Sequence, residues 1–427
     1  MHILIIGNGI AGATLARRLK ERGRGEELMV TLISDEAPYH FSRPAMMYLS
    51  TGQLRMEHLK SFPDESWDAL GISRVTGHVE RIDAEAKQVH LSNGTVLGAD
   101  VIVLATGSRP NVPTGLNTSL HGVHTYTQMQ DVAALDDSLK GAHHGVVIGG
   151  GLIGVEAAEI MATHMHARQG SSITSVVREH GFYGNMLPRF ESQLVTRHLQ
   201  QHGIGVRVTT TVSSIEDHDG DGRVDHVTLS DGTVIPADVV VVATGVVPRT
   251  QLAKDAGVTV DDGIVVDEWF RTSNATSFPR MRKSIIYAIG DCAQLPWGVQ
   301  QTWYAGRMHG EHLAEILLGS DEPFCEPIEY NSAKFFDLEW STYGRVPAES
   351  DSASSVLLTD TNDSRCLRIV HDAKRCVVGI HALGLRLRQS TCEQWIAQCK
   401  PLDHALEELR DVMFNAEFVP AFVGVAK

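Results

Sequence analysis

Residues 149–154 read Gly149-Gly150-Gly151-Leu152-Ile153-Gly154, and this stretch decides the fold. The apolar run 145–148 before it is typical of a short buried strand, and residues 155–167 after it predict a helix. Glycines at such a turn permit a tight bend, the approach of backbone N–H groups to a pyrophosphate, and close packing of the helix on the strand. The stretch therefore predicts a nucleotide-binding loop whose phosphates lie at the positive end of a helix dipole.

The chain opens with another copy of this pattern. Residues 2–6 form an apolar run, Gly7-Asn8-Gly9-Ile10-Ala11-Gly12 follows, and a helix is predicted to about residue 22. After the next predicted strand, 29–33, an acidic side chain should accept a hydrogen bond from a ribose hydroxyl. Asp35 and Glu36 are both candidates, and we favour Glu36. Two such loops, about 140 residues apart, predict two dinucleotides held face to face, as required for hydride transfer from a nicotinamide to a flavin.

Three further apolar strands run into small residues at their carboxyl ends. Residues 101–107 and 239–245 both end in Ala-Thr-Gly, and residues 285–291 end in Gly290-Asp291. Open α/β sheets bind ligands at this edge. The sequence therefore predicts an α/β protein with two Rossmann-like dinucleotide-binding domains, followed by a smaller α+β domain at the C-terminus.

These motifs resemble those of the FAD-dependent pyridine nucleotide–disulfide oxidoreductase superfamily, over residues 1 to about 320. The resemblance implies a flavoenzyme whose first loop binds FAD and whose second loop binds NADH or NADPH. It implies a discontinuous FAD-binding domain (1–112 and 237–322), an NAD(P)H-binding domain (113–236) and a C-terminal interface domain (323–427). Because relatives use this last domain for dimer contacts, a homodimer is also expected.

The resemblance extends to individual residues at both cofactor sites. It implies FAD contacts at Gly7, Gly9, Gly12, Arg43, Pro44, Thr106, Gly107, Asp291 and Thr302, with Gly245 at a crossover between domains. It implies NAD(P)H contacts at Gly149, Gly151, Gly154 and Glu156. Glu156 matches a family glutamate near the nicotinamide and flavin, which makes it the candidate catalytic residue. The alternative is a solvated helix carboxylate that the dipole favours.

Residues 38–50 indicate the branch of the superfamily. Disulfide-reducing members carry Cys-x-x-x-x-Cys here, and peroxidases and oxidases carry one cysteine, but this stretch contains none. A thiolate relay is therefore excluded at this position. The stretch resembles the Tyr-x-(Arg/Lys)-Pro segment of ferredoxin and rubredoxin reductases, although Tyr48 stands where ferredoxin reductases usually carry lysine. We expect direct electron transfer from the flavin to a small iron–sulfur carrier, or alternatively to a quinone.

The choice between the two nicotinamide cofactors rests on the residues after the predicted strand 173–177. Arg178 follows directly, and an arginine at this position can pair with the 2′-phosphate of NADPH. In the alternative, Glu179 accepts from the 2′-hydroxyl of NADH while Arg178 points to solvent. The sequence leaves both open.

Composition excludes several other classes. The chain has 427 residues, a net charge of −15 and a pI near 5.7, so it lacks the basic character typical of nucleic-acid binding. The N-terminus enters a strand without a charged leader, and no apolar run is long enough to span a membrane, so we expect a cytoplasmic protein. The apolar segment 413–423 is a candidate contact with a partner subunit or a membrane, which keeps a peripheral-membrane quinone reductase as an alternative.

No metal site is predicted. The six cysteines all lie at or after Cys292 without Cys-x-x-Cys spacing, and reduced structural thiols are expected. The 21 histidines include no His-Glu-x-x-His. Residues 217–222 superficially match a calcium loop, but Thr228 stands where the bidentate glutamate belongs, so a hairpin turn is predicted.

Residues 335–340 and the function of the whole chain each leave a further alternative. Residues 335–340 resemble an aromatic segment that ferredoxin reductases place beside the flavin ring, whereas the simpler interpretation is that Phe335, Phe336 and Trp340 form core. A third hypothesis for the whole chain is a redox-dependent flavin-binding interaction protein with slow turnover, whose two redox states differ in affinity for a partner.

Overall fold

The computed structural model describes residues 1–23, 28–273, 285–348, 354–362, 364–414 and 423–425. The chain divides into two compact units. The first comprises Met1–Asn111, Thr127–Val132 and Val246–Glu326, and the second comprises Val112–Tyr126, Ala133–Gly245 and Pro327–Lys427. Each unit contains its own five-stranded parallel sheet.

The sheet of the first unit has the strand order β19-β7-β1-β2-β3, and all its pairs are parallel. The strands are β1 (His2–Ile6), β2 (Met29–Ser34), β3 (Ile72–Thr76), β7 (Val101–Leu104) and β19 (Ile286–Ala288). The central strands β1 and β7 are apolar because they are covered on both faces: residues 3–5 and 102–104 are at most 1% exposed.

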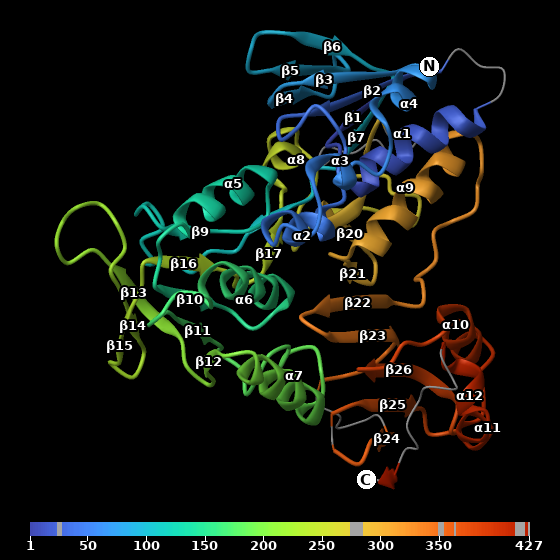
Figure 1. Ribbon diagram of the computed structural model, residues 1–427. Coiled ribbons are helices and arrows are strands. Elements are labelled where there is room, and N and C mark those ends of the chain that lie inside the picture. The colour runs from blue at the N-terminus through green and yellow to red at the C-terminus, as the bar shows by residue number, and fades with distance from the viewer. Residues whose placement is uncertain (24–27, 274–284, 349–353, 363, 415–422, 426–427) are drawn as a thin grey trace. The chain divides into compact units, whose positions relative to one another are not determined.

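Helices α1 (Ile10–Arg22) and α9 (Trp303–Leu317) lie side by side in this unit (Figure 1). They approach so closely that a Cβ atom on Gly310 would lie 2.5 Å from the carbonyl oxygen of Ala11. Arg18 on α1 also donates to Glu311 on α9 at 3.0 Å. The first and last segments of the unit therefore share one core.

The rest of the first unit consists of short elements. One three-stranded sheet contains β4 (Val79–Asp83), β5 (Gln88–Leu91) and β6 (Val96–Gly98). A second three-stranded sheet contains β18 (Ile264–Val265), β20 (Ala293–Leu295) and β21 (Gly298–Val299). A two-stranded sheet pairs β8 (Ser108–Pro110) with β17 (Val246–Pro248). Its short helices are η1 (Arg43–Ala45), α2 (Met46–Ser50), α3 (Met56–Leu59), α4 (Asp64–Ala69), α8 (Gln251–Asp255) and η2 (Gly290–Cys292). Helix α5 (Met129–Ser138) begins in the segment Thr127–Val132.

The second unit repeats the parallel sheet, in the order β12-β11-β10-β16-β9. The strands are β9 (Val123–His124), β10 (His144–Ile148), β11 (Ser172–Val176), β12 (Ile204–Arg207) and β16 (Val239–Val242), and the helices are α6 (Leu152–Met165) and α7 (Arg189–Gln201). A small antiparallel sheet contains β13 (Val212–Glu216), β14 (His226–Leu229) and β15 (Val234–Pro236). The α/β prediction with two dinucleotide-binding folds is confirmed.

The domain boundary predicted at residue 237 is wrong for one strand. The predicted FAD-binding segment 237–322 includes β16, but β16 pairs in parallel with β10 of the second unit, with Val240 opposite Val146. All four residues of β16 are at most 3% exposed, and such a strand needs a partner on each side, which β10 and β9 supply. The chain returns to the first unit only at Val246.

The second unit also contains a six-stranded antiparallel sheet, in the order β22-β23-β26-β25-β24-β27 (Figure 1). Its strands are β22 (Tyr330–Phe335), β23 (Leu338–Gly344), β24 (Ser354–Thr359), β25 (Cys366–His371), β26 (Val377–Leu383) and β27 (Val423–Val425). Helices α10 (Gln389–Ala397), α11 (Leu402–Glu407) and α12 (Leu409–Val412) follow β26 and share its core. This sheet and its helices correspond to the smaller α+β domain predicted at the C-terminus, in which the hairpin β22–β23 was not predicted.

The apolar C-terminal segment is only partly described. Met413 is buried and Phe414 is 55% exposed, whereas residues 415–422 lie outside the described chain. Beyond them, β27 pairs with β24, so part of the terminus completes the antiparallel sheet of its own chain. The expected contact of this segment with a partner or a membrane stays a prediction.

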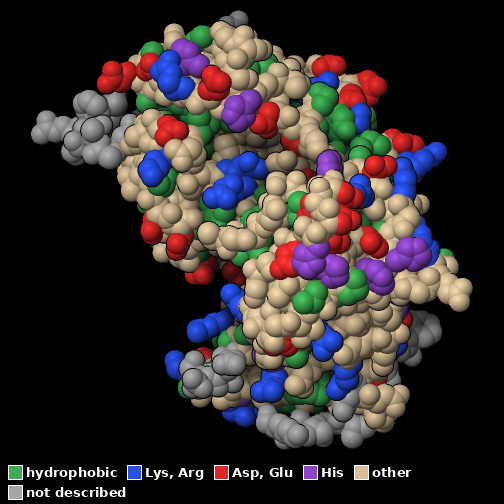
Figure 2. Space-filling model, turned by 90° about the vertical axis from the view of Figure 1, so that its left-hand side faces the viewer, with side chains coloured by type: hydrophobic (Ala, Val, Ile, Leu, Met, Phe, Trp, Pro, Cys, Tyr) green, Lys and Arg blue, Asp and Glu red, His purple; other side chains and the backbone are tan. Residues whose placement is uncertain are grey.

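The surface shows mixed charge. On the face drawn in Figure 2, acidic and basic side chains are intermingled. Among the described residues, no helix reaches the length and apolarity required to cross a bilayer.

Candidate functional site

The two glycine-rich loops have the same geometry at their first glycine. Gly7 follows β1 with φ of +113°, and Gly149 follows β10 with φ of +125°. A Cβ atom at either position would lie 2.1 Å from a backbone carbonyl oxygen, that of Ala105 in the first loop and that of Ala243 in the second. Both the backbone conformation and the space therefore require glycine.

The later glycines of the two loops also correspond. A Cβ atom on Gly12 or Gly154 would lie 2.0 or 2.2 Å from the carbonyl oxygen of the first glycine of its own loop. A Cβ atom on Gly9 or Gly151, which cap α1 and α6, would meet no protein atom within 4 Å. Open space therefore lies before each helix N-terminus, where a phosphate would meet backbone N–H groups. The residues of both loops fit a dinucleotide.

Other predicted contacts of the first site lie at the same sheet edge. The Thr106 hydroxyl, just after β7, donates to the carbonyl oxygen of Arg249 at 3.0 Å, and the Arg249 N–H donates to Gly107 at 2.9 Å. Asp291 follows β19 and accepts from the Ser108 hydroxyl at 2.9 Å, while burial raises the pKa of its carboxyl group. The structure thus gathers these residues at the carboxyl ends of β1, β7 and β19, which are neighbours.

Two predicted site residues begin helices. Thr302 is the N-cap of α9, and its hydroxyl accepts from the Ala305 N–H at 3.3 Å. Pro44 lies in the first turn of η1. The N–H groups of a first turn have no acceptor within the helix, so proline, which lacks an N–H, loses no hydrogen bond there. Their contact with a cofactor stays a prediction.

Glu36 is held in place by protein donors. Arg43 donates to its two oxygens at 3.0 and 2.6 Å, and the Met129 N–H donates to Oε1 at 2.9 Å. A carboxylate accepts about four hydrogen bonds, so one acceptor position is left for a ribose hydroxyl. Asp35, the other candidate, is 60% exposed and pairs with His78. The geometry therefore favours Glu36 over Asp35.

Glu156 lies on α6, directly after the second glycine-rich loop. Burial, with a smaller contribution from the charge of Glu159, raises the pKa of the Glu156 carboxyl group to about 8. The side chain is half-buried, and this raised pKa favours the protonated form near neutral pH over the alternative of a solvated carboxylate. Gly245, with φ of +98°, turns the chain after the neighbouring strand β16.

This raised pKa predicts a pH-dependent stability. From pH 4.5, the ordinary pKa of a glutamate side chain, to about pH 8, folded Glu156 keeps a proton that the unfolded chain releases. The free energy of unfolding should therefore fall with rising pH, by up to about 1.4 kcal/mol per pH unit from this group. Urea unfolding of the wild type and of Glu156→Gln between pH 5 and 8 measures the difference, because glutamine cannot ionise. Parallel stability profiles would contradict the burial of an ionisable group here.

Arg178 and Glu179 form an adjacent pair after β11. The Arg178 side chain is 76% exposed, and its Nε and one terminal nitrogen donate to Glu179 Oε1 at 3.1 and 2.7 Å. Glu179 itself is only 23% exposed. This arrangement matches the NADH alternative, in which the acid stays at the strand end and the arginine faces solvent.

Tyr183, between β11 and α7, was missed by the sequence analysis. Its φ is +56°, and its N–H donates to the carbonyl oxygen of Gly150 at 2.7 Å, which ties it to the second loop. Its ring lies 6.2 Å from the Phe335 ring and 5.3 Å from the Trp340 ring. Both of these aromatic residues are 1% exposed, so the structure supports the interpretation that they form core. The sequence signal is the pair of glycines that flank Phe182-Tyr183.

One thiol lies near the first site. The Cys292 Sγ is buried and donates to the carbonyl oxygens of Leu104 and Ile289 at 3.5 and 3.3 Å, and burial raises its pKa. A nucleophilic thiol needs a lowered pKa and solvent access. Cys292 has neither, so it does not replace the cysteines that residues 38–50 lack.

Each of the two parallel sheets is followed by a glycine-rich loop in which the same positions require glycine. Two such loops define a protein that binds two dinucleotides. A profile of the family described as pyridine nucleotide-disulphide oxidoreductase matches residues 1–310. The chain belongs to this family, so the predicted membership is confirmed.

Curated relatives place the chain in the ferredoxin reductase-like branch of this family. Rhodocoxin reductase from Rhodococcus erythropolis is 35% identical over 69% of this chain and 66% of that protein. The ferredoxin–NAD(+) reductase subunit of the benzene 1,2-dioxygenase system from Pseudomonas putida is 32% identical over 69% of this chain and 68% of that protein. Putidaredoxin reductase from the same species is 31% identical over 71% of this chain and 69% of that protein. The matches thus span about two thirds of these relatives.

Solved structures extend the similarity of fold to nearly the whole chain. The crystal structure of a covalent putidaredoxin reductase–putidaredoxin complex matches with a TM-score of 0.82 at 22% identity, covering 94% of each chain. The structure of a ferredoxin reductase from Rhodopseudomonas palustris matches with a TM-score of 0.78 at 24% identity, covering 90% of this chain and 91% of that one. At these identities the likeness concerns the fold alone.

Proposed function

We propose that this protein is an FAD-dependent oxidoreductase that takes electrons from NADH and passes them to a small iron–sulfur protein. The observation that carries the proposal is the pair of matching dinucleotide loops in a chain without a reactive thiol at residues 38–50. Electrons then leave the flavin without a protein disulfide. The names of the relatives, which are reductases of ferredoxin-type carriers, support the choice of acceptor.

The chain's own residues bind and orient in this proposal, and the flavin supplies the redox chemistry when bound. The N–H groups before α1 and α6 bind the two pyrophosphates. Glu36, fixed by Arg43, accepts from a ribose hydroxyl of the first dinucleotide. Glu156 adds no negative charge to the second site at neutral pH, because its carboxyl group is protonated there.

The test is anaerobic stopped-flow reduction of the purified yellow protein, followed by mixing of the reduced protein with separate acceptors. We expect NADH to bleach the flavin, and a ferredoxin or rubredoxin to reoxidise it faster than a quinone or air does. Fastest reoxidation by a quinone would favour the membrane alternative, and slow reoxidation by every acceptor would favour the redox-dependent binding protein. Failure of both nicotinamides to reduce the flavin would overturn the proposal.

The nicotinamide preference yields a separate prediction. Glu179→Gln should lower the ratio of kcat/KM for NADH to kcat/KM for NADPH by roughly tenfold, because a charge-assisted hydrogen bond to the 2′-hydroxyl, of about 1.5–3 kcal/mol, is replaced by a neutral one of about 0.5–1.5 kcal/mol. Arg178→Ala is the matched control, and its exposed side chain should leave the ratio within about threefold of wild type. A larger change in the arginine variant than in the glutamine variant would instead indicate recognition of a 2′-phosphate.

Three finer predictions belong to the same proposal: a cytoplasmic location, a homodimer, and a separate C-terminal interface domain. Analytical ultracentrifugation of the flavin-loaded protein tests the dimer, and fractionation of cells tests the location. A chain truncated after Glu326 that kept its flavin but became monomeric would support the interface role of the C-terminal domain.

A further inference from the structure

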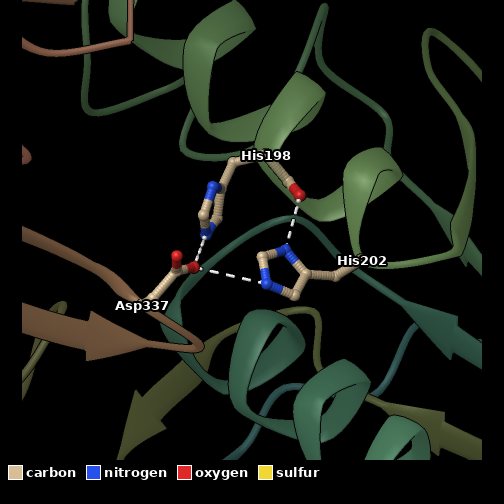
Figure 3. Close-up of side chains that lie close together, drawn as sticks. All are labelled: His198, His202 and Asp337. Carbon is tan, nitrogen blue, oxygen red and sulfur yellow. Dashed lines mark hydrogen bonds and ion pairs between the residues drawn. The ribbon is translucent and has the colours of Figure 1, made fainter.

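Three side chains with metal-ligand chemistry converge within the second unit (Figure 3). His198 lies on α7, and His202, four residues later, is the C-cap residue of this helix, so the two side chains lie on the same side of its C-terminal end. Asp337 lies in the two-residue turn between β22 and β23. The Nε2 atoms of the two histidines lie 3.1 and 3.3 Å from the same oxygen, Asp337 Oδ1.

The hydrogen bond of the His202 ring leaves one nitrogen lone pair for a cation. His202 Nδ1 lies 3.0 Å from the carbonyl oxygen of His198, and because a carbonyl only accepts, Nδ1 carries the proton. In neutral His202, Nε2 is therefore an unprotonated nitrogen that faces a carboxylate oxygen. His198 Nε2 is also buried and faces the same carboxylate oxygen, Asp337 Oδ1, at 3.1 Å. A cation between these atoms would relieve this repulsion.

The turn that carries Asp337 is held in a strained conformation. Phe336 has φ of +49°, which is unfavourable for a bulky residue, and its N–H donates to Glu159 Oε2 on α6 at 2.7 Å. The Phe336 ring stacks on the His202 ring at 4.3 Å. These contacts position the carboxylate of Asp337 opposite the two histidines.

We propose that His198, His202 and Asp337 bind a divalent transition-metal ion of the zinc class. Ligand atoms about 2.0–2.1 Å from a tetrahedral ion are roughly 3.4 Å apart, close to the two nitrogen–oxygen distances in this site. Metal-bound histidines usually donate their other ring nitrogen to a carbonyl or carboxylate, as His202 does. Asp337 is 79% exposed, so water can complete the coordination. The ion would connect α7 to the hairpin of the antiparallel sheet.

Two other groups of possible ligands lie around the turn between β13 and β14: His218, Asp225 and His226, and Asp217, Asp219 and Asp225. Their carboxylates already accept local backbone hydrogen bonds: Asp217 accepts from Gly220 and Gly222 at 2.7 and 2.9 Å. This agrees with the predicted hairpin turn. His218→Ala, at this second location, is therefore the control for metal binding elsewhere.

The test is titration of the metal-free, flavin-loaded protein with Co²⁺, followed by optical difference spectroscopy and competition with Zn²⁺. We expect one ion per chain, with visible bands typical of nitrogen and oxygen ligands. His202→Ala and Asp337→Asn should each weaken binding at least tenfold, whereas His218→Ala should leave it unchanged. Zn²⁺ should also raise the Tm of the wild type but not that of His202→Ala.

Several outcomes would overturn the proposal. These are no saturable binding by the wild type, full binding by the double variant His198→Ala/His202→Ala, or loss of binding in His218→Ala. A sulfur-to-cobalt charge-transfer band would assign the ion to cysteines instead. Because Asp337 lies in an exposed turn, its variant tests the site even if the histidine variants fold poorly.

Discussion

Replacement of Gly154 by alanine should lower the free energy of unfolding of the second unit by roughly 3 kcal/mol, within the range for overpacked sites. The added Cβ would lie 2.2 Å from the carbonyl oxygen of Gly149, and backbone atoms cannot move aside as a flexible side chain can.

In Gly151→Ala the added methyl group meets no protein atom within 4 Å. That variant should keep its stability but lose most of its nicotinamide binding, because the methyl group would occupy the space before α6.

The two variants separate folding from binding. Thermal unfolding monitored by circular dichroism should show a lower Tm for Gly154→Ala and an unchanged Tm for Gly151→Ala. Flavin reduction should need at least tenfold more nicotinamide in Gly151→Ala, with an unchanged flavin spectrum. Unimpaired reduction in this variant would show that the pyrophosphate does not bind at the second loop.

Replacement of Arg368 by methionine should destabilise the second unit by about 3–5 kcal/mol, the cost of leaving a buried charge without its partner. Glu191 on α7 has a fully buried side chain, and Arg368 on β25 pairs with both of its oxygens, one of them at 3.1 Å. Arg368 also donates to the Ser355 hydroxyl at 2.7 Å. Urea unfolding followed by tryptophan fluorescence measures the loss.

The matched control is Arg386→Met, which removes an arginine from the exposed pair with Glu339 in the same antiparallel sheet. Because Arg386 is 54% exposed, its loss should cost no more than about 1 kcal/mol. Adding Glu191→Leu to Arg368→Met should restore much of the stability, since it removes the unpaired charge. Equal effects of Arg368→Met and Arg386→Met would contradict the burial of the first pair.

Local patterns predicted the two loops and the strands around them well. Each loop is a continuous stretch of sequence. Its glycines are required by contacts with residues close in the chain or on a neighbouring strand, so the local sequence is enough to predict the structure of the loop.

Features that depend on contacts between residues far apart in the sequence could not be predicted from local patterns. β16 carries the same apolar pattern as a strand of the first sheet, and only its pairing with β10 shows where it belongs. β22 reads Tyr-Asn-Ser-Ala-Lys-Phe, which lacks a clear apolar alternation, so the hairpin β22–β23 was missed. Likewise, the spacing of His198 and His202 is visible in the sequence at the end of α7, but nothing in the sequence indicates that Asp337 faces these two side chains.

The packing of α1 against α9 has a consequence for biosynthesis. The segment Met1–Asn111 lacks β19 and α9 until the ribosome has added about 200 more residues, which takes roughly 10–40 s at bacterial to eukaryotic rates. During this interval the edge of β7 that later pairs with β19 is unpaired, and the face of α1 that later meets α9 is bare. We therefore expect the nascent N-terminal segment to bind chaperones, and flavin to be captured only after translation has passed α9.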